Sequence, residues 1–151
     1  MKSEFYNFST NENALSFEFQ SVSERKIVNK IVVYSPFPDN PQLFNLALGD
    51  ILENGEVSDL TVSNNADMEK VIATIVQTMF CFFEKYPECF VYFKGSTPER
   101  TRLYRIIISR ELEEANRTFQ IYGIIDSEIT VFERNCSYDS FVLALKNQNY
   151  L

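Results

Sequence analysis

The stretch most able to do chemistry is residues 93–105, FKGSTPERTRLYR, where cationic and hydroxyl side chains gather around a turn. Lysine and arginine form charge-assisted hydrogen bonds to phosphates and carboxylates, and hydroxyl groups add further donors. The pattern therefore predicts a site for an anionic ligand or an acidic partner. Its candidate residues are Lys94, Ser96, Thr97, Arg100, Arg102 and Arg105.

These residues lie where a strand is expected to end and a helix to begin. Lys94 and Gly95 close an apolar strand, and Ser96 and Thr97 can both cap the helix that follows. Ser96, with Glu99 three residues later, matches a capping box. Pro98 suits the first helical turn. A helix start carries partial positive charge and unsatisfied N–H groups, which also favour an anion.

Helical periodicity separates the arginines. At about 100° per residue, Arg102 and Arg105 face solvent, opposite the apolar side of the helix. Arg100 falls near the apolar side but in the first turn, so it points inward or toward the rim. An alternative without a ligand stays open. In it, Ser96 and Glu99 only cap the helix, Arg100 pairs with a nearby carboxylate, and the other two arginines are solvated.

The glycine content argues against the familiar nucleotide-binding loops. The chain has four glycines and no G-x-G, so it lacks the Rossmann fingerprint. A P-loop needs G-x-x-x-x-G-K-[ST], whereas Lys94 precedes a single glycine. We therefore expect no cofactor.

The absence of histidine restricts the chemistry further. It removes His-based general bases, Ser-His and Cys-His nucleophile pairs, and most zinc sites. In a histidine-free enzyme, Glu99 or Glu111 would be the acid–base group, although pairing of Glu111 with an arginine is the simpler interpretation. The spacing of Asp126, Glu128 and Glu133 matches no metal-binding loop, so no metal site is expected.

Length and composition indicate the class of protein. The 151 residues suit one domain over 1–151, and fourteen Phe and eight Tyr supply a core. A net charge of −7 disfavours binding of nucleic acid or an anionic membrane by the whole surface. The chain shows no secretory run, no membrane-length apolar segment and no C-x-x-C pair, which predicts a cytoplasmic protein without a membrane partner.

Alternating patterns up to residue 63 predict four strands: ALSFEFQSV, KIVNKIVVYS, LFNLALGDI and EVSDLTVS. The inward residues of the first two are expected to be Leu15, Phe17, Phe19, Ile27, Ile31 and Val33. SPFPDNP is expected to be a loop because of its three prolines. An Asn-Gly pair joins the last two strands as a hairpin.

Helical spacing replaces alternation from Asn64 onward. It predicts a helix capped by Asn64 or Asn65 and ended at Tyr86 by Pro87. CFVYFKG then reads as a central strand, residues 98–115 as a second helix, and FQIYGII as a strand that EITVFE could pair with. YDSFVLALK is expected to be a short C-terminal helix. This order predicts an α+β fold: a mostly antiparallel twisted sheet, two long helices packed on one face, and the short C-terminal helix.

Three motifs together resemble an uncharacterised family. They are FKGSTPERTRLY at residues 93–104, the I-Y-G strand near residue 122, and the YDSFVL segment from residue 138. The chain is similar over most of its length to a family of small bacterial proteins known as a domain of unknown function. The resemblance implies a bacterial cytoplasmic protein and carries no activity, substrate or catalytic residue.

The leading hypothesis is a small non-enzymatic binding or regulatory module. It would use the basic strand–turn–helix of residues 94–105 to contact a phosphate-bearing ligand or an acidic protein partner, with nucleic acid less favoured. The second hypothesis is a histidine-free enzyme acting on a phosphorylated or nucleic-acid substrate, in which Lys94 and Arg100 stabilise negative charge. The third is a purely structural subunit.

Overall fold

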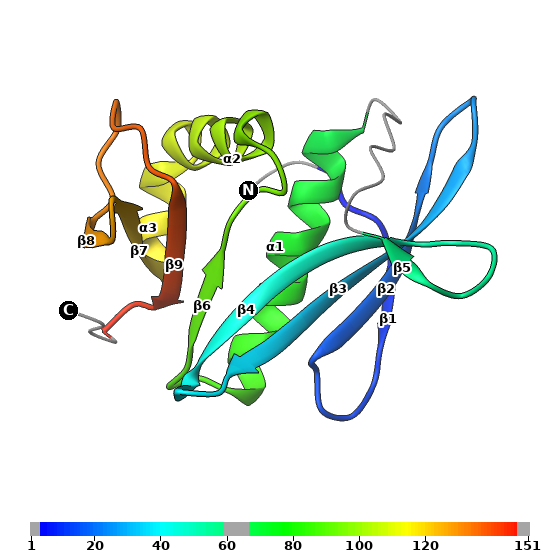
Figure 1. Cartoon of the computed structure of the whole chain (residues 1–151), viewed down its shortest axis with the longest axis horizontal. Helices are drawn as coiled ribbons and strands as arrows, with labels where there is room; N and C mark the ends of the chain where they lie inside the picture. Colours follow the sequence, from blue (N-terminus) through cyan, green and yellow to red (C-terminus); the bar gives the residue numbers. More distant parts are fainter. Residues whose placement is uncertain (1–3, 59–66, 148–151) are drawn as a thin grey trace. The chain divides into compact units, whose positions relative to one another are not determined.

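The computed structural model describes residues 4–58 and 67–147. The strands hydrogen-bond in the order β1-β2-β3-β4-β6-β9-β7-β8, with β5 on β4. The β4–β6 pair is parallel, and β1–β2, β2–β3, β4–β5, β6–β9, β9–β7 and β7–β8 are antiparallel. The mostly antiparallel α+β fold expected from the sequence is confirmed (Figure 1).

The chain divides into two compact units. Of the described residues, the α1 unit comprises 4–35, 47–58 and 67–86, and the α2–α3 unit comprises 36–46 and 87–147. Strands β3 (Ile27–Phe37) and β4 (Asn40–Ile51) run through both. The expectation of a single domain stays a prediction.

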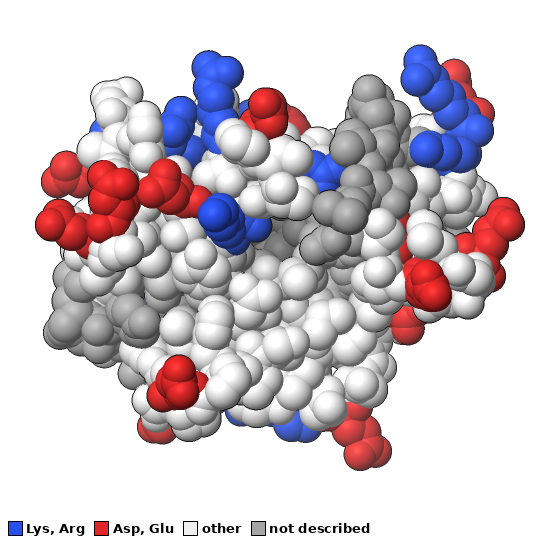
Figure 2. Space-filling model, in the orientation of Figure 1, with Lys and Arg blue, Asp and Glu red and all other residues white. Residues whose placement is uncertain are grey.

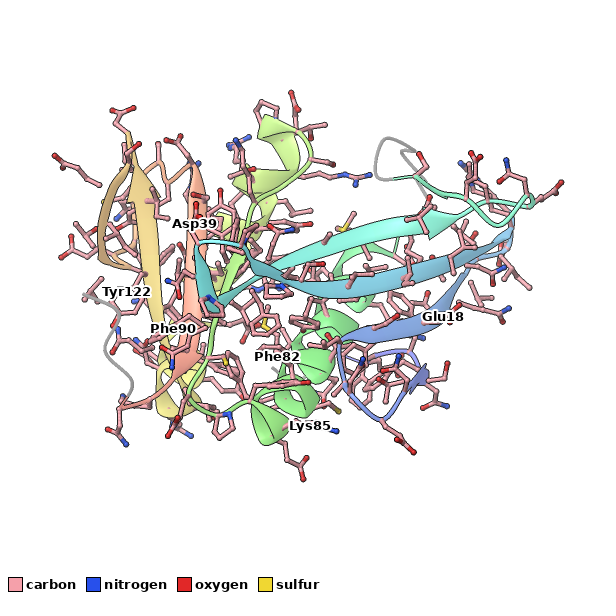
Figure 3. All side chains as sticks on the ribbon, turned by 60° about the horizontal axis from the view of Figure 1, so that its bottom comes forward. Glu18, Asp39, Phe82, Lys85, Phe90 and Tyr122 are labelled. Atoms are coloured by element: carbon pink, nitrogen blue, oxygen red, sulfur yellow. The ribbon has the colours of Figure 1, made fainter. Side chains whose placement is uncertain are left out.

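The α1 unit packs one helix on a meander of strands. Its further elements are β1 (Phe8–Thr10), β2 (Ser16–Val22), β5 (Val57–Ser58) and α1 (Met68–Lys85). The predicted inward face of β2 is confirmed, because Phe17 and Phe19 are buried. Phe82 of α1 stacks on Tyr34 of β3 with ring centroids 4.5 Å apart, and Figure 3 shows Phe82 on the helix behind β3 and β4.

A buried ion pair lies within the α1 unit. The Lys30 ammonium on β3 donates to Asp50 Oδ1 on β4 at 2.6 Å, and the two side chains are only 6% and 5% exposed. The second oxygen, Asp50 Oδ2, is buried with no hydrogen-bond partner among residues 4–58 and 67–147. Breaking such a pair leaves an uncompensated buried charge, so it constrains the strands that carry it.

The prediction for the inward face of β3 is wrong. Ile27 is 61% exposed, whereas Lys30, Val32 and Tyr34 are buried. Register explains this, because Lys30 and Val32 stand opposite the buried Phe19 and Phe17. Both faces of β3 carry apolar residues. The buried Lys30 makes the inward face look like a solvent face in the sequence.

The α2–α3 unit contains the remaining sheet and two helices. They are β6 (Phe90–Phe93), α2 (Pro98–Arg110), α3 (Leu112–Thr118), β7 (Phe119–Ile125), β8 (Glu128–Val131) and β9 (Ser140–Leu145). The central position expected for β6 is confirmed, since it lies between β4 and β9. Phe90 and Tyr122, labelled in Figure 3, form an apolar cluster with Val142 and Ala144.

The predicted short C-terminal helix is wrong, because its residues form strand β9. This strand lies between β6 and β7 and is buried from Ser140 to Ala144. Val142 belongs to the cluster around Phe90, while Phe141 stacks on Phe93 with centroids 5.2 Å apart. Burial on alternating sides produces a continuous apolar run, which does not show the period of a strand.

The second predicted helix is interrupted. Helix α2 ends at Arg110 and α3 begins at Leu112, with Glu111 (φ −100°, ψ 12°) between them. The structure thus has three helices over the described ranges, in place of two long helices and a C-terminal one. Each long helix is placed in its own unit, and the expectation that both pack on one face is not confirmed.

Two boundaries near prolines and asparagines also differ from expectation. The expected SPFPDNP loop is mostly strand, because β3 continues to Phe37 and β4 starts at Asn40, leaving a two-residue turn. Asp67 precedes α1, and the predicted caps Asn64 and Asn65 lie outside the described residues. Of the expected EVSDLTVS strand, only Val57 and Ser58 are described as strand.

Candidate functional site

The turn from β6 to α2 is a tight connection held by Gly95 and Thr101. The Gly95 N–H donates to Thr101 Oγ1 at 3.0 Å, and the Thr101 hydroxyl donates to the Thr97 carbonyl at 3.3 Å. A Cβ at position 95 would lie 2.4 Å from the Thr101 nitrogen and 2.8 Å from the Arg100 carbonyl carbon. Only glycine fits there, so the strand end is held against the backbone of the first helical turn.

The helix cap is Thr97, one of the two caps that the sequence allowed, and the predicted capping box of Ser96 and Glu99 is wrong. Thr97 has extended backbone angles (φ −136°, ψ 159°), and its Oγ1 accepts from the Arg100 N–H at 3.2 Å. Ser96 Oγ instead accepts from Arg100 Nη1 at 3.2 Å. The bond between Gly95 and Thr101 explains the shift, because it places the first turn one residue later than the S-x-x-E spacing suggests.

Three of the candidate residues meet around this first turn. Ser96 and Thr97 both contact Arg100, one through the guanidinium and the other through the backbone N–H. Each hydroxyl oxygen accepts in these bonds and retains its own proton for donation. Lys94 lies before the turn, and Arg102 and Arg105 lie further along α2, three residues apart on one side of the helix.

The four cations of the candidate site are not neutralised by carboxylates of the described chain. Lys94 and Arg102 are exposed, while Arg100 and Arg105 are half-buried. Among residues 4–58 and 67–147, no Asp or Glu lies within ion-pair distance of any of the four. Figure 2 shows basic side chains standing over α2 at the top of the view. The alternative without a ligand had Arg100 paired with a carboxylate, and no such pair is found among these residues. Arg105 is less exposed than predicted.

Tyr104 marks the inward side of α2. Its ring lies edge-on to Phe93 of β6, with centroids 6.1 Å apart. Burial raises the pKa of the Tyr104 hydroxyl above its usual value of 10.0, although the charge of Arg100 acts in the opposite direction. Arg100 is therefore close enough to Tyr104 to act on it electrostatically, which places this guanidinium at the rim between solvent and core.

A family model covers most of the chain. The model of a family of unknown function (DUF6934) matches residues 2–146. The chain belongs to this family. A search of curated proteins and a search of solved structures both return no match. Membership of the family brings no assigned activity, so the function has to be argued from the site itself.

Sequence reasoning missed two residues that hold the two ends of α2. The first is Thr101, and the only sequence signal for it is a threonine six residues after a glycine at a strand–helix junction. Arg134 was missed as well: its Nε donates to the Ser109 carbonyl at 2.8 Å and so satisfies the C-terminal end of α2. The sequence gives no signal for this second contact, because 25 residues separate the two partners.

The candidate acid–base residues are not assembled with Arg100. Glu111 lies at the far end of α2 and pairs with Arg110, with Nε and Oε1 3.4 Å apart, as the sequence suggested. Eleven residues of helix separate Arg100 from Glu111, a distance of about 16 Å along the axis. Glu99 is in the first turn but exposed. The geometry therefore supports charge recognition more directly than acid–base chemistry.

The described residues of this chain meet neither the requirements of a metal site nor those of a membrane-spanning helix. Over residues 4–58 and 67–147, no group of three His, Cys, Asp or Glu side chains is arranged to hold a metal ion. Asp126 and Ser127 form the turn between β7 and β8 with positive φ values of 50° and 67°, so these residues have a structural reason to be there. None of the described helices is both long and apolar enough to cross a bilayer.

Proposed function

We propose that the chain is a non-enzymatic binding or regulatory module that uses residues 94–105 to contact an acidic protein partner or a phosphate-bearing ligand. One observation carries the proposal: four cations at one strand–turn–helix have no carboxylate partner among the described residues of a chain with net charge −7. Residues 93–110 hold five basic side chains and one acidic one. This local excess is opposite in sign to the molecule and attracts anions.

The spacing of the cations favours an extended acidic segment over a single phosphate. Pro98 has no N–H, and the Arg100 N–H is already occupied by Thr97, so the helix start itself offers few free donors. Along α2, Thr97 and Arg105 are about 12 Å apart. One phosphate cannot reach side chains over that length, whereas several carboxylates of a peptide can.

The free cysteines support the compartment that we propose. Cys81, Cys89 and Cys136 are all unpaired, which fits a reducing compartment, and we propose the cytoplasm. A bacterial origin rests on the family resemblance and stays a prediction.

Binding of an acidic peptide tests the proposal. A fluorescent oligoglutamate of about ten residues and inorganic phosphate would each be titrated into the purified chain at low and moderate salt. Arg102→Glu should weaken peptide binding several-fold, because it replaces attraction by repulsion, and added salt should reduce the difference. Arg117→Glu is the matched control, since Arg117 is an exposed arginine of α3 in the same unit.

The two results are separable. Equal affinities for Arg102→Glu and Arg117→Glu would show that only net charge matters and would refute a site at residues 94–105. Phosphate binding that Arg100→Ala abolishes, without peptide binding, would instead favour a small ligand held at the first turn. That result would also bring back the alternative of a histidine-free enzyme acting on a phosphorylated substrate.

A further inference from the structure

The α1 unit exposes apolar side chains at one end of its sheet. Of eight large hydrophobic residues exposed in the part of the chain that the structure describes, three lie on β2, β3 and β5, beside the turns of the β2–β3 and β4–β5 hairpins. Val22 and Ile27 are 50% and 61% exposed and stand directly opposite each other on β2 and β3. Val57, 56% exposed, stands opposite the half-buried Ile51 on the β4–β5 pair. We call these four residues, Val22, Ile27, Ile51 and Val57, the hairpin patch.

The hairpin patch lies on the face of the sheet that α1 does not cover. Phe17, Phe19 and Ser21 of β2 are buried, so Val22, the next residue, points to the other side, as does its cross-strand partner Ile27. On β4, Asp50 is buried in its pair with Lys30, so Ile51 and its partner Val57 also point away. Figure 3 views this face, with β3 and β4 in front of α1.

The position of Val57 is fixed by its packing. A Cβ on Gly49 would lie 2.6 Å from Val57 Cγ1, so the valine side chain rests directly on the glycine backbone. Patches of apolar residues ringed by polar ones typically mark interaction surfaces. Since β-branched side chains are also stiff, an ordered apolar patch of this kind loses little side-chain entropy on binding.

The two turns that border the patch carry opposite charges. The turn between β2 and β3 contains Arg25 and Lys26 beside a single Glu24, and the turn between β4 and β5 contains Glu53 and Glu56. All five side chains are exposed. In Figure 2 the hairpin tip at the upper right is mostly basic, and the tip below it is acidic.

We propose that the hairpin patch pairs two copies of this chain face to face. A two-fold axis running along the strands, between the two facing sheets, places the basic turn of one copy over the acidic turn of the other. The same operation brings the apolar residues of both copies together and removes them from water. A surface that carries both signs across an apolar centre is complementary to itself, which identifies a second copy as the partner.

Charge swapping tests this pairing. The oligomeric state of the full chain would be measured by sedimentation equilibrium over a range of concentrations at low salt. Arg25→Glu/Lys26→Glu and Glu53→Lys/Glu56→Lys should each weaken self-association by at least about tenfold, because like charges then face each other. An equimolar mixture of the two variants should associate about as tightly as the unmodified chain, since both pairs of turns regain opposite charges.

Controls make each result decisive. Glu128→Lys/Glu133→Lys changes net charge by the same amount as Glu53→Lys/Glu56→Lys at exposed positions of the other unit, and it should leave association unchanged. Unfolding curves would verify that each variant folds. A chain that stays monomeric at every concentration would overturn the proposal. So would variants that still self-associate, or a mixture that fails to associate.

Discussion

Two regions of this molecule differ in whether their charged side chains are buried and paired. In the α1 unit, Lys30 and Asp50 are buried and paired at 2.6 Å. In the α2–α3 unit, Lys94, Arg100, Arg102 and Arg105 lie at or near the surface without a carboxylate partner in the described ranges. In the first region the two charges compensate each other inside the protein. In the second region the positive charges remain available to solvent ions or a binding partner. A buried charge acts on folding, and an exposed unpaired one acts on binding.

This contrast indicates which region of the family member is the better candidate for function. The buried pair has the stronger local interaction, and its position between β3 and β4 gives it a structural role. The exposed cations have weak internal contacts, and their concentration at one turn has no equivalent structural explanation. Mutations should therefore separate the two regions cleanly, with large effects on stability in the first and small ones in the second.

The largest effect is expected from Asp50→Ala. It leaves the Lys30 ammonium buried without its partner, so the free energy of unfolding should fall by about 3–5 kcal/mol in chemical denaturation. Lys30→Met/Asp50→Leu removes both charges and should cost clearly less. If the double variant were as unstable as the single one, the pair would matter through packing and not through charge.

The second largest loss of stability is expected from Gly95→Ala, because Gly95 lies against the backbone of the first turn of α2. The added methyl would meet the Thr101 nitrogen at 2.4 Å, and backbone cannot move aside easily, so we expect a loss of about 3 kcal/mol. Gly55→Ala is the control. Nothing lies within 4 Å of a Cβ there, and its φ of +86° alone should cost about 1–2 kcal/mol. Equal costs would mean that the close approach at Gly95 is relieved by small shifts.

Thr97→Ala tests which hydroxyl caps α2. Loss of the bond from the Arg100 N–H should lower the free energy of unfolding by about 1 kcal/mol. Ser96→Ala, at the residue before, removes only an exposed contact to the Arg100 guanidinium and should be nearly neutral. The reverse order in thermal unfolding would restore Ser96 as the cap.

The smallest effect on stability is expected at Arg102. Because Arg102 is exposed and has no ion pair to a described residue, Arg102→Ala should change the free energy of unfolding by less than about 0.5 kcal/mol. The same variant should weaken binding of the acidic peptide. A large loss of stability would show that Arg102 has a structural role, like the buried Lys30–Asp50 pair.

The sequence predicted elements well where one periodicity dominates. The alternation around Phe17 and Phe19, the stripe of α1 up to Tyr86 and the strand of Phe90 all appear as expected. It failed where burial hides periodicity. Strand β9 is covered on both sides, and so its apolar run looked like a short helix.

The candidate site was predicted in composition but not in detail. The helix start, its proline and the surrounding cations follow from local residue types. The choice of Thr97 over Ser96 as the cap depends on Thr101 contacting Gly95, which is a matter of three-dimensional packing. In the same way, the inward position of Lys30 depends on Asp50, twenty residues later, and alternation alone assigns a lysine to solvent.

The place of β9 in the sheet has a consequence for how the molecule is made. Strands β6 and β7 both pair with β9, which follows β7 in the chain by about fifteen residues. Until residues 140–145 have been synthesised, each of the two earlier strands has an open edge toward the missing one. A chain that ends before residue 140 would lack β9, an interior strand of the sheet and not an edge strand. Nascent or cleaved fragments of this length should therefore be prone to aggregation.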